Sequence, residues 1–210
     1  MASHLTRSMR HLARGLTFGL AALAVVVVVA ARMSAAGPDP SQFYLQSLAL
    51  GGTGCPQGTF GQAMADTRTI ETTAFDTYIA VSGPSIPATE LRKTCQLNLN
   101  FNVPVAPASA VVTLTTHGFA QLKAGQSAQV TSVFTWNGEI VKTVSTTIAG
   151  PTSGNYTQTA SVLLTSAGGV ASVQPLNVTS TVRINDSPSP VAAGQVTVDF
   201  INIASAESQS

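Results

Sequence analysis

The sequence predicts an all-β fold, an antiparallel β-sandwich of two packed sheets stapled by one disulfide. β-branched and aromatic residues alternate with Thr, Ser, Asn and Gln at a period of two beyond residue 36, which is typical of half-buried strands. Clusters of Gly, Pro and Ser interrupt these runs at short intervals, and no segment beyond residue 36 has the period of an amphipathic helix. Two sheets are expected because a single sheet would leave one apolar face in water.

The alternating runs predict eight strands, at 69–81, 95–103, 110–117, 128–136, 139–148, 155–164, 176–184 and 195–203. Ahead of the first strand, Gly37-Pro38-Asp39-Pro40 fits neither helix nor sheet, because proline fixes φ and lacks an N–H donor. We therefore expect an extended leader at 37–47, the sandwich domain at 48–204 and a flexible tail at 205–210.

One hairpin can be assigned a register. The pair Asn137-Gly138 lies between two alternating runs and favours a type I′ turn, because both residues tolerate positive φ. An unbroken ladder from this turn places Phe134 opposite Val141. We expect these two side chains and that of Val130 to face the core.

The N-terminus has the three parts of a secretory signal peptide. Arg7, Arg10 and Arg14 form a basic region, residues 16–31 are an apolar run, and Ser34-Ala35-Ala36 supplies small residues for cleavage before Gly37. An uncleaved anchor is the alternative, but sixteen apolar residues fall short of the roughly 20 that span a bilayer. We expect residues 1–36 to be a signal peptide and the protein to be secreted or at the cell surface, with no permanent membrane anchor.

Charge excludes two classes of protein. Only 9% of the residues are charged and 44% are hydrophobic, whereas a disordered chain has low hydrophobicity and high net charge. Four of the ten basic residues lie in the signal peptide, which leaves six basic and nine acidic residues, a net charge of −3. We therefore expect no nucleic-acid partner and no general attraction to anionic lipid.

Cys55 and Cys95 are the two cysteines of the chain. Two cysteines in an exported protein allow one disulfide, and we expect these two to form it. A metal or redox site is the alternative, but the sequence has no Cys-x-x-Cys and no histidine beside either cysteine.

Five segments resemble a known family of secreted fungal and bacterial proteins. They are GGTGCPQG at 51–58, RKTCQLNL at 92–99, GFAQL at 118–122, GPTSGNY at 150–156 and LNVTSTVRI at 176–184. In this order they are similar to the motifs of the domain of unknown function 4360. The resemblance implies a signal peptide, a β-rich extracellular domain and a structural disulfide, and it implies no reaction, substrate or catalytic residue. The chain departs from fungal members at 165–168, where they carry a Pro-Cys-Gly segment, and at His117, where many have Arg.

Groups capable of catalysis are scarce. After the signal peptide His117 is the only histidine, and no Gly-x-Ser-x-Gly elbow or pair of metal-spaced histidines accompanies it. Glu71 and Asp76 have an odd separation, so a regular strand points them to opposite faces. We expect no catalytic residue, no metal and no cofactor.

A binding role has a sensible chemical basis. Sugars stack on exposed aromatic rings, and hydroxyl and amide side chains complete their hydrogen bonds. Trp136 at the hairpin tip and Tyr156 beside Asn155 are candidate ligand-binding residues. A partly buried position at the edge of the core is the alternative for Trp136, and a face rich in Thr and Ser is also normal for an exposed antiparallel sheet.

The sequence therefore favours a secreted, non-enzymatic β-sandwich for cell-surface adhesion or carbohydrate recognition, with a glycan or a cell-surface component as partner. The alternative is a secreted hydrolase whose site is assembled from scattered carboxylates and His117. The two hypotheses differ in whether those side chains meet in one pocket.

Overall fold

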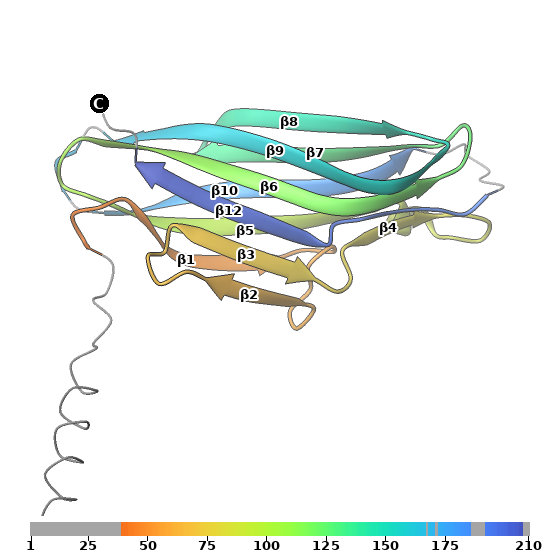
Figure 1. The fold of residues 1–210 in the computed structure, drawn as a ribbon, viewed down its shortest axis with the longest axis horizontal. Coiled ribbons are helices and arrows are strands. Elements are labelled where there is room, and N and C mark those ends of the chain that lie inside the picture. The colour runs from red at the N-terminus through yellow and green to blue at the C-terminus, as the bar shows by residue number, and fades with distance from the viewer. Residues whose placement is uncertain (1–38, 167, 171, 186–191, 208–210) are drawn as a thin grey trace, which may run out of the picture. The chain divides into compact units, whose positions relative to one another are not determined.

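The protein is an antiparallel β-sandwich, as predicted (Figure 1). The computed structural model describes residues 39–166, 168–170, 172–185 and 192–207, so the expected signal peptide lies outside the described part. Within those ranges the helical content is one 3₁₀ turn at Ala88–Leu91, and no helix is long and apolar enough to cross a membrane.

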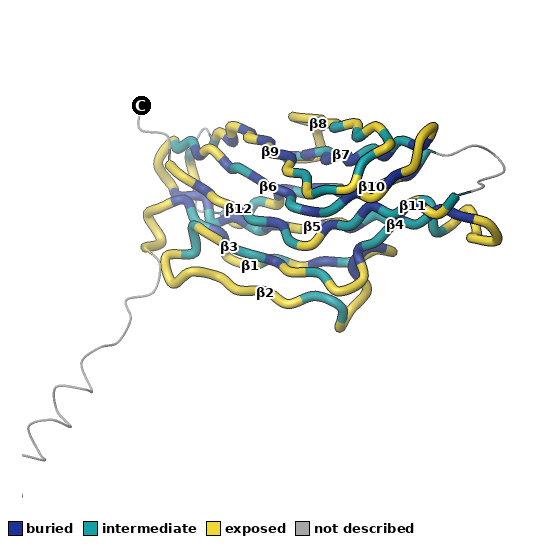
Figure 2. Tube along the Cα trace, turned by 45° about the vertical axis from the view of Figure 1, so that its right-hand side comes forward, coloured by how far each residue is buried: buried dark blue, intermediate teal, exposed yellow. Residues whose placement is uncertain are grey.

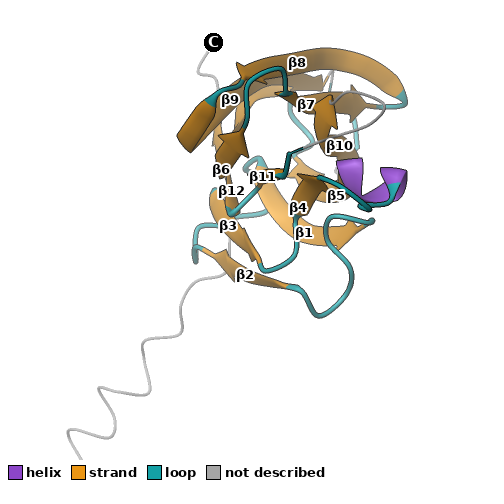
Figure 3. Ribbon diagram, turned by 90° about the vertical axis from the view of Figure 1, so that its right-hand side faces the viewer, coloured by secondary structure: helices purple, strands orange, loops and turns teal. Residues whose placement is uncertain are grey.

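Two sheets face each other, as the end-on view in Figure 3 shows. The five-stranded sheet has the order β1 (Tyr44–Gly51), β5 (Arg92–Val103), β10 (Ser172–Asn185), β7 (Ser127–Trp136) and β8 (Glu139–Ala149). The seven-stranded sheet has the order β2 (Phe60–Met64), β3 (Ile70–Phe75), β12 (Phe200–Glu207), β6 (Ala108–Leu122), β11 (Gly194–Thr197) and β4 (Ile79–Ser82), and β9 (Thr152–Ser166) pairs with β6.

Period-two alternation decides which side chains form the core. On β5 the residues Leu97, Leu99 and Phe101 are fully buried, and the amide side chains between them point outward. The long strand β6 alternates in the same way along most of its length. Figure 2 shows buried positions along the central strands, whereas the edge strand β2 is exposed along most of its length.

The described residues form twelve strands, whereas the sequence predicts eight. The predicted strands 69–81 and 195–203 are each divided into two, β3 with β4 and β11 with β12. Strands β1 and β2 were not predicted, for different reasons.

In β1 the pairing register shifts between Leu45 and Ser47. Leu45 is buried before the shift and Leu50 is buried after it, so the buried positions change from odd to even residue numbers. Strand β1 begins at Tyr44, inside the segment 37–47 for which an extended leader was expected. At the other end of the chain, β12 reaches Glu207, inside the segment 205–210 for which a flexible tail was expected. Strand β2 is an edge strand with Gly61 and Ala63, so it lacks the β-branched alternation that marks other strands.

The expected hairpin forms, but its predicted register is wrong beyond the first two pairs. Asn137 and Gly138 both have positive φ, at 52° and 84°, as the turn requires. A register shift between Phe134 and Thr135 makes Val141 an extra residue on β8, so Phe134 pairs with Lys142. Phe134 and Val130 are buried as predicted, whereas Val141, the unpaired residue of the bulge on the edge strand β8, is 41% exposed.

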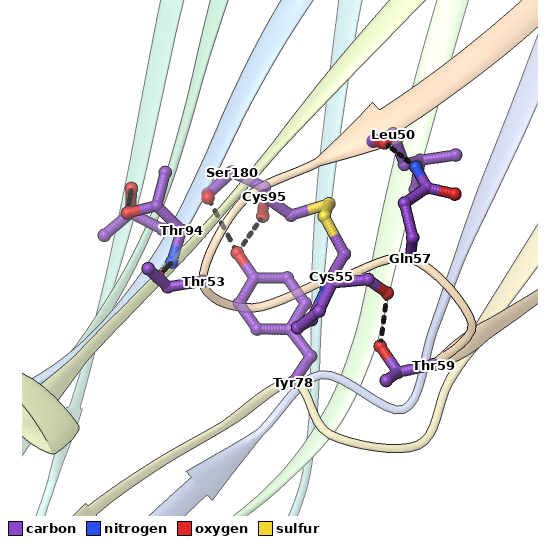
Figure 4. Close-up of a disulfide and its surroundings, with 11 residues drawn as sticks. Leu50, Thr53, Cys55, Gln57, Thr59, Tyr78, Thr94, Cys95 and Ser180 are labelled. Carbon is purple, nitrogen blue, oxygen red and sulfur yellow. Dashed lines mark hydrogen bonds between the residues drawn. A yellow bond between two sulfur atoms is a disulfide. The ribbon is translucent and has the colours of Figure 1, made fainter.

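The predicted Cys55–Cys95 disulfide is present, with a Cα–Cα distance of 5.4 Å (Figure 4). It fastens the loop after β1 to β5, and glycines make the close approach possible. A Cβ on Gly52 would collide with the carbonyl oxygen of Thr94, and a Cβ on Gly54 would collide with the ring of Tyr78. The Gly-x-Gly-Cys segment is therefore needed for the loop to lie against β5.

Tyr78 crosses from the seven-stranded side to the five-stranded sheet beside this disulfide. Its side chain is fully buried, and its hydroxyl donates to the carbonyl oxygen of Ser180 at 2.7 Å, with the Ser180 hydroxyl at 3.1 Å (Figure 4). Burial raises the pKa of the phenol above its ordinary value. The hydroxyl therefore stays protonated and keeps donating.

We expect the double variant Cys55→Ala/Cys95→Ala to fold with lower stability. The disulfide closes a separation of 40 residues. In the chain-entropy model its loss costs about 4 kcal/mol, which corresponds to a fall in Tm of roughly 10 °C for a domain of this size. Thermal melts with and without reductant check this, because reductant should destabilise only the wild type. Equal melting temperatures for oxidised wild type and the double variant would contradict a stabilising role.

The buried carboxyl of Glu71 should make the stability of the fold depend on pH. Its side chain is 1% exposed, Oε1 accepts a hydrogen bond from the Thr73 hydroxyl at 2.6 Å, and burial raises the pKa of the carboxyl. An acid with a raised pKa in the folded state favours folding when protonated, so this contribution is complete below the unfolded pKa and is lost as pH rises through the folded pKa.

We therefore expect Glu71→Gln to raise Tm at pH 7 by a few degrees, because it keeps the shape of the side chain and removes the buried charge. The gap between variant and wild type should shrink as pH falls toward about 4, where the wild-type carboxyl is protonated. Melts across this range measure the gap. A variant that is less stable than wild type at pH 7 would mean that the charged carboxylate is stabilising.

Candidate functional site

A groove of about 270 Å³ lies on the outer face of the five-stranded sheet. Three neighbouring strands, β5, β10 and β7, supply its walls and floor. The lining consists of guanidinium, amide, hydroxyl and one apolar side chain, namely Arg92, Gln129, Thr131, Val133, Thr179, Thr181 and Arg183.

Strand pairing brings these side chains together. Thr181 on β10 pairs with Thr94 on β5 and with Thr131 on β7, and Thr131 pairs in turn with Ser145 on β8. The hydroxyls of Thr94 and Thr181 lie 3.2 Å apart, and those of Thr131 and Ser145 lie 2.8 Å apart. A row of hydroxyl groups therefore crosses four strands, and each group can both donate and accept hydrogen bonds.

Amide side chains extend this polar surface along β5. Gln96 and Asn98 are exposed, and Asn98 pairs with Asn177 on β10. Further along the strand, Asn100 donates to the hydroxyl of Ser47 at 3.0 Å, and Asn102 donates to main-chain oxygens at 2.8 and 3.1 Å. The amide groups of Asn100 and Asn102, far from the groove, are therefore fixed by protein contacts. Gln96 and Asn98, beside the groove, face solvent.

The floor of the groove is held from behind by one inward-facing row of buried residues. Cys95, Ser180 and Ser132 are paired across β5, β10 and β7. Cys95 carries the disulfide, Ser180 accepts from Tyr78, and Ser132 donates to Oε1 of Gln158 at 2.9 Å. Because Gln158 belongs to β9 and Tyr78 directly precedes β4, polar contacts from the opposite sheet fix the backbone beneath the groove.

The residues that a hydrolase would need lie elsewhere. His117 is on the outer face of β6, in the other sheet, where its ring stacks on Phe200 with centroids 4.3 Å apart. Its Nδ1 lies 3.2 Å from the Thr157 hydroxyl. Asp199 follows β11 and accepts from the Thr197 hydroxyl at 2.7 Å. The groove lining contains neither a carboxylate nor a histidine. Within the described ranges, no group of three or more His, Cys, Asp or Glu residues could hold a metal.

The two predicted ligand-binding aromatics lie away from the groove. Trp136 is 6% exposed and has the same parity along β7 as Phe134, which is the sequence signal that its ring faces the core. Tyr156 is half-buried, its hydroxyl donates to the carbonyl oxygen of Thr197 at 2.6 Å, and burial raises the pKa of its phenol. Their ligand-binding role stays a prediction, and neither presents an open ring face on the five-stranded sheet.

Gly118 explains the position of Tyr156. These residues are paired across β6 and β9, and the tyrosine ring passes over the glycine to reach Thr197. A Cβ on Gly118 would collide with the Thr197 carbonyl oxygen and with the end of the tyrosine ring. Packing therefore explains why position 118 of β6 is a glycine.

Sequence analysis missed the residues of the groove. Five of the seven are outward polar positions in predicted strands, namely Gln129, Thr131, Thr179, Thr181 and Arg183, and that was the one signal available. Arg92 precedes the predicted strand 95–103, and Val133 is apolar. The groove requires the strand order β5-β10-β7, which joins segments far apart in the chain, and alternation within single strands does not specify that order.

Comparison with known proteins gives two further findings. An "uncharacterized secreted protein" of Arthroderma benhamiae is 38% identical over 120 residues, which cover 57% of this chain and 49% of the relative, so the match spans about half of the relative's length. A solved structure of TmCBM61 in complex with β-1,4-galactotriose aligns with 76% of this chain and 89% of that chain at 8% identity. Its TM-score of 0.29 is too low to support an argument about fold or ligand.

The family predicted from the five sequence segments is confirmed. The family described as domain of unknown function DUF4360 matches residues 41–209, which is most of the chain. This chain belongs to the DUF4360 family.

Proposed function

We propose that the protein is an exported, non-enzymatic recognition module that binds a polysaccharide at the groove on its five-stranded sheet. The observation that carries this proposal is the lining of the groove, where hydroxyl, amide and guanidinium groups from three strands converge on one open surface. A sugar ring presents several hydroxyl groups, each of which donates and accepts hydrogen bonds. Threonine and glutamine side chains match that chemistry, and rigid strands hold them in place.

Export is supported by three independent features. The basic and apolar pattern of residues 1–36 is that of a signal peptide. The disulfide requires an oxidising compartment to form and persist. The relative from Arthroderma benhamiae is named as a secreted protein. An exported protein meets polysaccharides at or beyond the cell surface, so adhesion to a wall or matrix glycan is the role that this site fits.

We expect the double variant Thr131→Val/Thr181→Val to weaken glycan binding at least tenfold. Each substitution keeps the side-chain shape and removes one hydroxyl from the groove, and two lost hydrogen bonds at about 1 kcal/mol each exceed a factor of ten. The protein should be expressed with its leader, purified from the exported fraction and screened on an array of neutral and acidic oligosaccharides. Binding constants for the hits then come from calorimetry.

The matched control is Thr113→Val/Thr159→Val, which removes two hydroxyls from the outer face of the seven-stranded sheet. This control should bind as wild type does. Loss of binding in the control but not in the groove variant would move the site to the other sheet. Release of reducing ends from a bound glycan, abolished by His117→Ala, would overturn the non-enzymatic proposal in favour of a hydrolase.

A further inference from the structure

Two arginines lie opposite each other at one end of the groove. Arg92 on β5 and Arg183 on β10 are paired across the strands, and both side chains are exposed. Side chains that are directly opposite on neighbouring antiparallel strands start about 5 Å apart at Cβ, and like charges in such pairs repel. Alternation puts both guanidinium groups on the face that carries the threonine row.

In the described part of the chain, no carboxylate lies within ion-pair distance of either arginine. Two of the other four cations are engaged with the protein itself: Lys93 pairs with Glu90 at 2.8 Å, and Arg68 donates to the carbonyl oxygen of Gln46 at 2.8 Å. The remaining two, Lys123 and Lys142, are exposed and lie apart from the groove. Two of the six basic residues after the signal peptide are therefore placed together without a charged partner there. A bound anion is the partner that would remove their mutual repulsion.

The chemistry around the pair narrows the class of anion. The guanidinium group binds carboxylate bidentately through its planar fork of N–H donors. Thr179, Thr181 and Thr131 continue the groove from the arginines with groups suited to sugar hydroxyls. A ligand that fits both ends carries a carboxylate on a hydroxyl-rich ring. The net charge of −3 after the signal peptide gives no broad positive surface for DNA or anionic lipid.

We propose that Arg92 and Arg183 make the groove selective for acidic polysaccharide, with the carboxylate of a uronic acid unit bound between them. This inference rests on the proposed function and names the class of glycan that the same site takes. The arginines act as the specificity-determining residues, and the threonine row supplies hydrogen bonds that a neutral sugar would make equally well.

The test compares one polysaccharide with its own carboxyl-reduced form. Oligogalacturonate and the carboxyl-reduced oligomer differ only in whether C6 of each sugar is a carboxylate or a hydroxymethyl group. We expect wild-type protein to bind the acidic oligomer at least tenfold more tightly, with an affinity that falls as salt rises. Arg92→Gln/Arg183→Gln should lose that preference and its salt dependence, so that it binds the acidic and the reduced oligomer with equal affinity.

Lys123→Gln/Lys142→Gln is the matched control, because it removes the same charge from exposed positions outside the groove. It should keep the preference for the acidic oligomer. The melting temperature of Arg92→Gln/Arg183→Gln should stay at the wild-type value or above, because removal of two opposed arginines relieves repulsion. That of Lys123→Gln/Lys142→Gln should stay at the wild-type value, because both lysines are exposed.

Each other outcome overturns a defined claim. Equal binding of the acidic and reduced oligomers by wild type would overturn the acidic selectivity and leave the proposed function standing. Binding of neither oligomer, with no hits on the glycan array, would overturn the proposed function together with this inference. Arginine-dependent binding to duplex DNA or to phosphatidylserine vesicles as tight as to oligogalacturonate would replace the uronic acid with a general polyanion.

Discussion

The structure depends on one row of buried contacts that ties the two sheets together. Cys95, Ser180 and Ser132 lie side by side on the inner face of the five-stranded sheet, and each has a partner that reaches it from outside its own sheet. The partners are the Cys55 sulfur in the disulfide, the Tyr78 hydroxyl and the Gln158 amide. Directional contacts of this kind fix position more strictly than apolar packing does, because a buried polar group without its partner is costly. The outward neighbours of the row, Thr94, Thr179 and Thr181, form the groove or adjoin it, so its geometry follows from the same contacts.

Because charged residues are scarce, the pairing of two arginines on one sheet face distinguishes that face from the other. Only 9% of the residues are charged, and both outer sheet faces carry paired hydroxyls: Thr113 with Ser161 on one face and Thr131 with Ser145 on the other. Such surfaces resemble each other in composition, and composition alone does not identify a binding face. The five-stranded face carries the groove, and it is distinguished by the placement of Arg92 and Arg183 in register. The opposite face carries the stacked pair of His117 and Phe200.

Sequence patterns predicted the strands well where alternation is unbroken and failed where a bulge resets it. On β5 the alternation Leu97, Leu99, Phe101 leaves no ambiguity about the buried face. In β1 the shift near Leu45, and in β8 the extra residue Val141, each change which positions face inward. No local signal announces either bulge. The groove could not be predicted from the sequence, because it is created by long-range pairing of β10 with β5 and β7 and not by any motif within one strand.

The central claim is that the outer face of the five-stranded sheet is the binding surface, and chemical-shift mapping tests it most directly. Amide spectra of the isotope-labelled protein should be recorded while oligogalacturonate is added. The account predicts that shifts concentrate on residues 92–96, 129–133 and 179–183, around the groove, and leave 113–117, 157–161 and 200–204 on the opposite face unchanged. Shifts confined to the second set, around His117 and Phe200, would contradict the account and place recognition on the seven-stranded sheet.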